Sequence, residues 1–562
     1  MKNKKDQKRY SGNFITCFFL TIIAAFLFFL SNPNFSFSKG IGFLAFFIYL
    51  PLFFVIQKST FSNVWLYGGF YGVLSYSLYG YWLKNFHPLG LIIVCICYFF
   101  ICALLFLLLK WVFKIFKKSS WIVMLLCICG YEYIKTTGFL GISYGVTAYT
   151  QWKNIYLIQI CEIAGVFGLN LLVIFPSAWL FSFITKKIEK NRIQNNQDFE
   201  KKSHIAAYVN KEKLLALVSL RFTYALGIVW ILLMICSYAY GFIDLMKTEQ
   251  HDSVTVAAIQ NNDTPWKNGI EEYSKNVKSL IHLTEDAQAL SPDIDFVIWP
   301  ETAVAPSIIY NYDYGTDVRR FMLVSQILHF IDENNAVFVI GNSHEVDLHQ
   351  AERARYNSAL VFESGKNVSP PKPEIYSKTK LVPFVEDFPW KYYFPTLYVW
   401  LLNGDIHMWE RGDEYKVFDY RGLKFSTPIC FEDTFSFVCR RMVLNGARCF
   451  MNLSNDSWSN SLACQNQHLA MAVFRSVENE VPSVRCTASG ETCVINYNGI
   501  IENKAPEFCE AFLIGKVPVL SDSHKTLFTK TGDIAGIAEV LLALVILIIQ
   551  SIHVIINKII DK

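Results

Sequence analysis

The sequence predicts a bundle of membrane-spanning helices that carries a layered α/β domain outside the membrane. The chain has 562 residues, of which 53% are hydrophobic and only 17% are charged, whereas soluble domains carry about 25% charged residues. The apolar excess is confined to residues 1–245 and 534–558, and residues 252–520 have a soluble composition. These limits define three predicted domains: an N-terminal membrane domain, an extramembrane domain and a C-terminal transmembrane helix.

Eight apolar segments are candidate spans, because a bilayer core of about 30 Å requires about 20 helical residues. The predicted spans are 13–31, 40–56, 64–83, 88–109, 120–137, 157–184, 214–243 and 534–558. Lysine and arginine gather in the N-terminal segment and in the loops after the fourth and sixth spans. Because cations in short loops mark the cytoplasmic side, we expect both termini in the cytoplasm and residues 252–520 outside it.

Two carboxylates lie within these apolar segments, Glu132 and Glu162. Charged groups are costly inside a membrane and are often functional there. The alternative to a functional role for Glu132 is that it lies at the membrane interface and its side chain reaches water. For Glu162 the alternative is pairing inside the helix bundle.

Composition and spacing argue against several classes of site. The formal net charge is only +4 and no basic stripe with aromatic residues occurs, so nucleic acid is not an expected partner. Neither a CxxC pair nor a P-loop is present, so we expect neither a metal nor a nucleotide cofactor. Seven of the fifteen cysteines lie in the extramembrane domain, and an odd number leaves at least one thiol free.

Short β-rich runs separated by turns and helical patterns recur in residues 252–520. Most of these runs are apolar on both faces, as expected for strands that are covered on both sides. The alternation predicts a layered α/β domain. The predicted strands are 254–260, 295–300, 336–342, 356–362, 423–430, 447–454, 482–488 and 492–499, and the predicted helices are 269–289, 317–333 and 465–480.

Three reactive groups stand out in this domain: Glu301 follows the predicted strand 295–300, Cys430 ends the predicted strand 423–430, and Lys378 lies in the segment YSKTKLVPF. A thiol must be deprotonated to act as a nucleophile. A carboxylate can take its proton, and an ammonium group can stabilise both the thiolate and a tetrahedral oxyanion. Taken alone, each residue also has an ordinary interpretation: Glu301 as a surface carboxylate, Lys378 as a solvated lysine and Cys430 as a buried structural cysteine. Lys380 is a second candidate for the role of the catalytic lysine.

The motifs around these residues resemble those of the nitrilase, or carbon–nitrogen hydrolase, superfamily: WPET at 299–302, YSKTKLVPFVE at 376–386 and ICFED at 429–433. This resemblance implies an α-β-β-α sandwich of nitrilase type. Seven spans ahead of the domain and one behind it are similar to the apolipoprotein N-acyltransferase branch. EYIKTTGF in the membrane part and NLSNDSWSN after the cysteine also resemble that branch.

The resemblance implies that Glu301 is the general base, that Lys378 stabilises the thiolate and the oxyanion, and that Cys430 is the nucleophile. The supporting or substrate-binding candidates are Glu386, Glu432, Trp266, Phe431, Asn455 and Trp458. Val385 stands where the family usually has glycine, and Phe431 where tyrosine is frequent. These two departures leave the rate and the substrate preference open.

The implied reaction is a two-step acyl transfer. Cys430 takes an acyl chain from a membrane phospholipid as a thioester, and the amino group of a diacylglyceryl-cysteine at the N-terminus of an apolipoprotein receives it. The expected location is the bacterial inner membrane, with residues 252–520 in the periplasm. One alternative is a membrane-tethered amidase that releases the acyl group to water, and another is a non-catalytic membrane scaffold or transporter.

The segment FPWKYYFPTLYVWLL, residues 388–402, is unusually apolar for an extramembrane loop. Aromatic side chains of this kind favour the membrane interface. We interpret the segment as a lid that guides acyl chains to Cys430. The alternative is an ordinary helix packed inside the sandwich.

Overall fold

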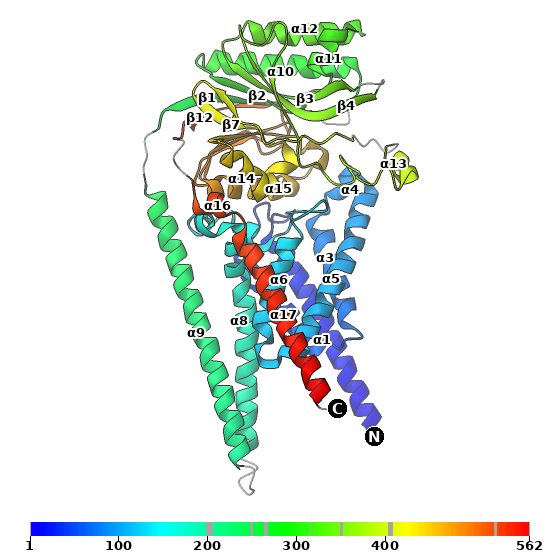
Figure 1. Cartoon of the computed structure of the whole chain (residues 1–562), viewed down its shortest axis with the longest axis vertical. Helices are drawn as coiled ribbons and strands as arrows, with labels where there is room; N and C mark the ends of the chain where they lie inside the picture. Colours follow the sequence, from blue (N-terminus) through cyan, green and yellow to red (C-terminus); the bar gives the residue numbers. More distant parts are fainter. Residues whose placement is uncertain are drawn as a thin grey trace.

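The computed structural model describes residues 2–197, 206–247, 251–263, 268–315, 317–348, 352–402, 408–521 and 525–560. A long helical bundle carries a layered α/β domain at one end (Figure 1). Both chain termini lie at the opposite end of the bundle.

The bundle is built from apolar helices of unequal length. They are α1 (Lys2–Ser31), α2 (Tyr49–Lys58), α3 (Val64–Tyr79), α4 (Leu83–Phe86), α5 (Pro88–Phe116), α6 (Ser120–Ile134), α7 (Ile155–Ile158), α8 (Cys161–Gln197), α9 (Ala206–Leu245) and α17 (Ile534–Ile560). Among the described residues, five helical stretches are long and apolar enough to cross a membrane. One of these, 89–134, contains both α5 and α6 and therefore two of the predicted spans.

The predicted span 157–184 is not one continuous helix. The short helix α7 ends before α8 begins, and within α8 Gly165 has a φ of 64°, a conformation that glycine adopts at little cost. Just after this break, the backbone N–H of Val166 donates a hydrogen bond of 3.0 Å to the carboxylate of Glu478. A side chain from the α/β domain thus satisfies a donor that the interrupted membrane helix leaves unpaired.

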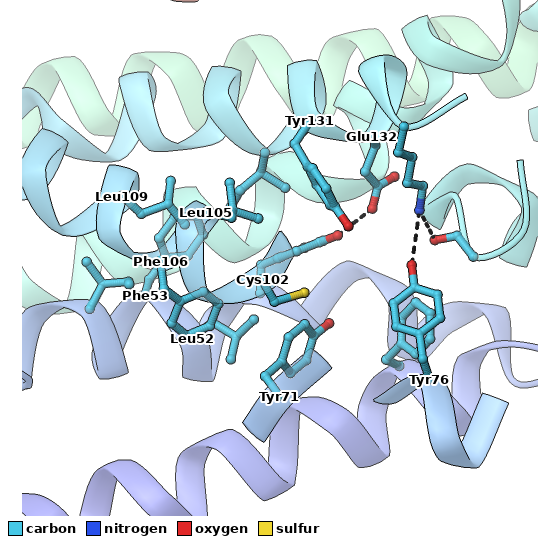
Figure 2. A pocket seen from close by; sticks show the side chains of 16 residues that line it. Leu52, Phe53, Tyr71, Tyr76, Cys102, Leu105, Phe106, Leu109, Tyr131 and Glu132 are labelled. Atoms are coloured by element: carbon cyan, nitrogen blue, oxygen red, sulfur yellow. Dashed lines mark hydrogen bonds between the residues drawn. The ribbon is translucent and has the colours of Figure 1, made fainter. Parts of the chain in front are cut away.

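The two carboxylates of the apolar segments are both paired. Glu132 is only 1% exposed and accepts hydrogen bonds from the Tyr49 hydroxyl and from the backbone and hydroxyl of Thr147. It lies beside a small cavity lined largely by apolar and tyrosine side chains (Figure 2). The interpretation of Glu132 as an interfacial residue that reaches water is therefore wrong. Glu162 accepts a hydrogen bond of 2.6 Å from Tyr240 of α9, which confirms pairing inside the bundle.

Two six-stranded sheets form the centre of the α/β domain, with strand orders β12-β1-β2-β3-β4-β5 and β11-β10-β9-β8-β7-β6. The strands of the first sheet are β1 (Ser253–Gln260), β2 (Phe296–Val304), β3 (Val337–Leu348), β4 (Glu352–Glu363), β5 (Glu374–Ser377) and β12 (Ala511–Pro518). Those of the second are β6 (Phe418–Tyr420), β7 (Leu423–Ser426), β8 (Cys449–Ser454), β9 (Ser483–Thr487), β10 (Cys493–Ile495) and β11 (Ile501–Lys504). The central pairs β1–β2, β2–β3, β7–β8 and β8–β9 are parallel.

Helices cover the outer faces of both sheets (Figure 1). The helices of this domain are α10 (Ile270–Leu290), α11 (Ile308–Tyr314), α12 (Val318–Asp332), α13 (Pro395–Leu402), α14 (Ser436–Leu444), α15 (Leu462–Asn479) and α16 (Leu527–Thr531). Alternate residues of β1 and β2 point to opposite cores: Val256 and Ile298 pack between the sheets, and Ala257 and Val297 pack under α10 and α12. Burial on both faces explains why these strands are continuously apolar.

The predicted strand 423–430 ends earlier than expected. β7 stops at Ser426, and Cys430 begins a short 3₁₀-helix, η4 (Cys430–Thr434). Pro428 lies between the two elements and cannot donate a backbone hydrogen bond to a neighbouring strand. The cysteine is therefore presented on a turn after the strand.

Candidate active site

The three reactive residues come from three separate elements of the two sheets. Glu301 lies in β2, Lys378 directly follows β5, and Cys430 opens η4 after β7. The backbone N–H of Lys378 donates a hydrogen bond of 2.9 Å to the carbonyl oxygen of Asn357 on β4, which fixes the start of its loop. Strands hold side chains more rigidly than free loops do.

These residues meet in one buried cluster. Lys378 Nζ lies 3.4 Å from Glu301 Oε1 and 2.9 Å from Glu386 Oε1. The Asn357 amide donates a hydrogen bond of 2.8 Å to the same Glu301 oxygen, and the Cys430 thiol also donates to Glu301. Lys378 is 1% exposed and Glu301 is 7% exposed. The structure thus brings together all three members of the predicted triad and Glu386.

Burial and neighbouring charges set the protonation of this cluster. Burial raises the pKa of the Cys430 thiol well above its ordinary value, and the Glu301 carboxylate adds to the rise. Burial also raises the pKa of Glu301, although the Lys378 ammonium opposes this shift. Burial lowers the pKa of Lys378, but Glu386 and Glu301 together raise it above its ordinary value. Cys430 therefore rests as a thiol next to the Glu301 carboxylate, which burial makes a stronger base than a solvated carboxylate.

Glu432 ties the loop of Lys378 to the turn of Cys430. Its fully buried carboxylate accepts hydrogen bonds of 2.8 Å from the Ile429 N–H and 2.7 Å from both the N–H and the hydroxyl of Thr379. The turn needs this support because Cys430 has a φ of 48°, a left-handed conformation that is costly for a residue with a side chain. Glu432 thereby joins the segment after Lys378 to the turn of Cys430.

A cavity of about 1140 Å³ adjoins this cluster and extends to the membrane helices. Glu301, Glu386 and Cys430 line it on the side of the sheets, and the buried Lys378 contacts both of these carboxylates. On the side of the bundle, its wall is mostly apolar and aromatic, with residues of α3, α4, α5 and α6 such as Leu89, and it also includes the polar side chains of His87 and Lys135. The cavity therefore joins a partly buried thiol and two carboxylates to surfaces that suit hydrocarbon chains.

The supporting candidates are distributed around this cavity. Phe431, Asn455, Trp458 and Val385 line its wall. The Trp458 ring contacts the rings of Trp82 and Phe86 on the bundle, with centroid distances of 5.6 and 5.4 Å. Trp266 lies outside the described residues.

Phe388 is buried, but residues 389–400 are all partly or fully exposed and so do not lie inside the sandwich. Tyr392 is 85% exposed and Trp400 is 57% exposed, and Trp400 also lines the cavity. Trp390 packs against Phe139 of the bundle with a centroid distance of 5.3 Å. The alternative of an ordinary packed helix is therefore wrong.

The sequence interpretation missed one group of charged residues at the site. The ring nitrogens of His468 lie 2.7 Å from carboxylate oxygens of Asp433 and Asp456. The partners come from η4, the segment after β8 and α15, so no local pattern indicates the cluster. Among the described residues, no group of three or more His, Cys, Asp or Glu side chains is arranged to hold a metal ion.

Comparison with known proteins places the chain in a family. Residues 16–179 match the model of the apolipoprotein N-acyltransferase N-terminal domain, and residues 255–521 match that of carbon–nitrogen hydrolase. Apolipoprotein N-acyltransferase 1 of Treponema denticola is 36% identical over 554 residues, which cover 97% of each chain. Its namesake from Treponema pallidum is 37% identical over 538 residues, 94% of this chain and 95% of the relative.

One solved structure, Nit3 of Saccharomyces cerevisiae, is described as a member of the nitrilase superfamily. It covers 47% of this chain and 90% of its own, with 16% identity and a TM-score of 0.34. The family assignment depends on the two treponemal relatives, which align over nearly the full length at more than 30% identity. The chain belongs to the apolipoprotein N-acyltransferase family, and its α/β domain is of the nitrilase type.

Proposed function

We propose that this protein transfers an acyl chain from a membrane phospholipid to the N-terminal amino group of diacylglyceryl-cysteine in bacterial apolipoproteins. The names of its relatives support acylation of lipoproteins in general. The observation that carries the specific proposal is the cluster of Glu301, Lys378 and Cys430 beside a cavity that the apolar bundle helices also line. The acyl chain of a lipid donor could approach the thiol along the apolar part of this wall.

In the first step, the Cys430 sulfur attacks the ester carbonyl carbon of the phospholipid while Glu301 accepts the thiol proton. The negative charge on the carbonyl oxygen is stabilised by the nearby Lys378 ammonium. The ester C–O bond then breaks, and the leaving alkoxide takes the proton back from Glu301. The products are a lysophospholipid and an acyl thioester on Cys430.

In the second step, the neutral α-amino group of the apolipoprotein attacks the thioester carbonyl. Glu301 accepts a proton from the nitrogen, the C–S bond breaks, and the sulfur recovers a proton as the amide forms. The thioester conserves the acyl group in a form that amines attack readily, so a separate energy source is not needed. The same base and the same cation serve both steps.

The remaining candidates have roles that follow from their positions. We assign Glu386 and Glu432 to holding Lys378 and the Cys430 turn, because both carboxylates bond to these segments. Phe431, Asn455 and Trp458 are assigned to the wall that contacts substrate. For Trp266 we retain placement of the acyl substrate as a prediction from the family resemblance alone.

We further propose eight membrane-spanning helices, with residues 1–245 and 534–558 in the inner membrane and residues 252–520 as the periplasmic catalytic domain. Both termini would face the cytoplasm. The cation-rich loops support this orientation, as does the position of both termini at the end of the bundle away from the sheets (Figure 1). Seven spans ahead of the catalytic domain require it to lie opposite the N-terminus.

The segment 388–402 is proposed to enter the membrane interface as a lid. Replacing Trp390, Tyr398 and Trp400 together with serine is expected to lower acyl transfer from phospholipid vesicles at least about tenfold, because large apolar side chains supply the interfacial binding. Transfer from a short, soluble thioester donor should change little. The matched control is Tyr314→Ser, which removes an exposed aromatic ring from α11. Equal losses with both donors would refute the lid.

The proposed function is tested by mass spectrometry of the N-terminal peptide of a lipoprotein from cells depleted of this protein. We expect the N-acyl group to disappear, to return with the wild-type gene and to stay absent with Cys430→Ala. Persistent N-acylation in cells without a second such enzyme would contradict the proposal. Release of free fatty acid by the purified protein, unaffected by an amine acceptor, would instead identify an amidase-type hydrolase.

A further inference from the structure

Next to Cys430, four charged side chains form a buried cluster. His468 Nδ1 lies 2.7 Å from Asp456 Oδ2, and His468 Nε2 lies 2.7 Å from Asp433 Oδ1. Arg485 pairs with the other oxygen of Asp433. His468 is only 1% exposed, and the other three side chains are also buried.

The geometry requires the charged form of the His468 ring. A neutral imidazole carries one N–H, so one of its nitrogens would direct a lone pair at a carboxylate; the imidazolium donates from both. Burial lowers the pKa of His468, but Asp456 and Asp433 outweigh it and raise the pKa to about 9. With Arg485, the cluster holds two cations and two anions and is neutral overall.

The cluster acts directly on the nucleophile residue. His468 Nε2 lies 3.3 Å from the backbone carbonyl oxygen of Cys430, the residue whose φ of 48° is costly. Besides burial and Glu301, the Asp456 carboxylate contributes to the raised pKa of the Cys430 thiol. The groups that face His468 are Asp433 and Cys430 of η4, Asp456 after β8, Arg485 of β9 and the Tyr144 ring at a centroid distance of 6.5 Å.

We propose that His468 is the positioning residue of Cys430: its charged ring holds the carbonyl of the strained turn and neutralises the aspartates that oppose thiolate formation. This inference rests on the proposed function, because it takes Cys430 as the nucleophile. It adds to the triad a second charge cluster, which contacts the Cys430 carbonyl, whereas Glu432 binds the Ile429 N–H. Without the imidazolium charge, the cluster would carry a net negative charge beside the thiol.

Two substitutions separate the charge of His468 from its contact with the turn. The amide of His468→Gln reaches the position of Nε2, and the amide of His468→Asn reaches that of Nδ1, while both remove the charge. In both variants we expect alkylation of Cys430 by iodoacetamide at about pH 8 to slow about tenfold, the effect of one pKa unit. We expect kcat to fall about tenfold in His468→Gln and about a hundredfold in His468→Asn, which also loses the contact with the Cys430 carbonyl.

The controls distinguish this role from a general effect on folding. His344→Gln removes another buried histidine of the same domain, one that does not line the cavity, and should leave both readouts unchanged. Adding Asp456→Asn to His468→Gln restores neutrality, so alkylation should return toward the wild-type rate. Thermal unfolding measurements check that each variant folds.

If the His468 variants do not fold, Asp456→Asn alone provides the test. It is expected to speed alkylation of Cys430, because it removes one of the anions that oppose formation of the thiolate.

The wild-type enzyme supplies a further readout in its pH profile. Because the His468 pKa is raised to about 9, the charged ring is complete at neutral pH and is lost as the pH rises through that value. We therefore expect the kcat of the wild-type enzyme to decline as the pH rises through about 9. This decline should be absent in His468→Gln. Unchanged alkylation and an unchanged pH profile in folded His468 variants would overturn the inference while Cys430 remains essential. Acyl transfer by Cys430→Ala would instead overturn the proposed function.

Discussion

Replacing Cys430 with alanine is expected to lower acyl transfer by at least about 10³-fold while leaving the fold intact, because removal of a covalent nucleophile leaves only binding and electrostatic effects. The sulfur lies at the wall of the cavity beside Glu301, so its loss exposes no buried charge. The measurement is transfer of a labelled acyl chain from phospholipid vesicles to a diacylated peptide. In the absence of acceptor, the wild-type peptide that contains Cys430 should gain the mass of one acyl chain.

The matched control is Cys509→Ala. Cys509 is a partly exposed free thiol of the same α/β domain and does not line the cavity, so its removal should leave activity and acyl labelling at the wild-type level. An acyl adduct on Cys509, or full activity without the Cys430 sulfur, would show that the reaction uses another nucleophile.

Replacing Lys378 with glutamine is expected to lower acyl transfer about as much as Cys430→Ala does. The same change at Lys380 should have only a small effect on acyl transfer. The sequence alone left these two lysines in competition. Lys378 Nζ contacts the carboxylates of Glu301 and Glu386, but Lys380 Nζ donates to the carbonyl oxygens of Gly138 and Phe139 on the bundle. Only the first lysine can stabilise charge at Cys430, so the pair forms its own control in the vesicle assay.

The Lys378→Gln variant should also lose about 3–5 kcal/mol of unfolding free energy, because a buried ion pair that loses one partner leaves an uncompensated charge. The pKa of Glu301, already raised by burial, should rise further without the ammonium. Protonation then removes the charge as the pH falls, so the stability deficit relative to wild type should shrink toward acidic pH. Denaturation measured at several pH values checks this, and a deficit that grows on acidification would contradict the buried cluster.

Several features follow from local sequence patterns. All eight predicted strand segments contain a strand, because runs such as residues 254–260 are apolar on both faces and bounded by turns. Among the strands that the structure describes, β5, β6, β11 and β12 were not predicted, and they include short or polar segments such as Ile501–Lys504. Their pairing depends on the neighbouring strand and not on their own composition.

The sequence by itself determined the division into apolar helices and an α/β domain of ordinary charged-residue content, and its motifs marked Glu301, Lys378 and Cys430. Hydrophobicity and period act over a few residues, so they can be read locally. Only the tertiary structure decided that Lys378 meets Glu301 across 77 positions of the chain, that Lys380 turns to the bundle, and that His468 bridges two aspartates. Such contacts depend on how the sheets and helices pack. A buried charge needs a partner, and here the partners are distant in the sequence and meet only in the folded chain.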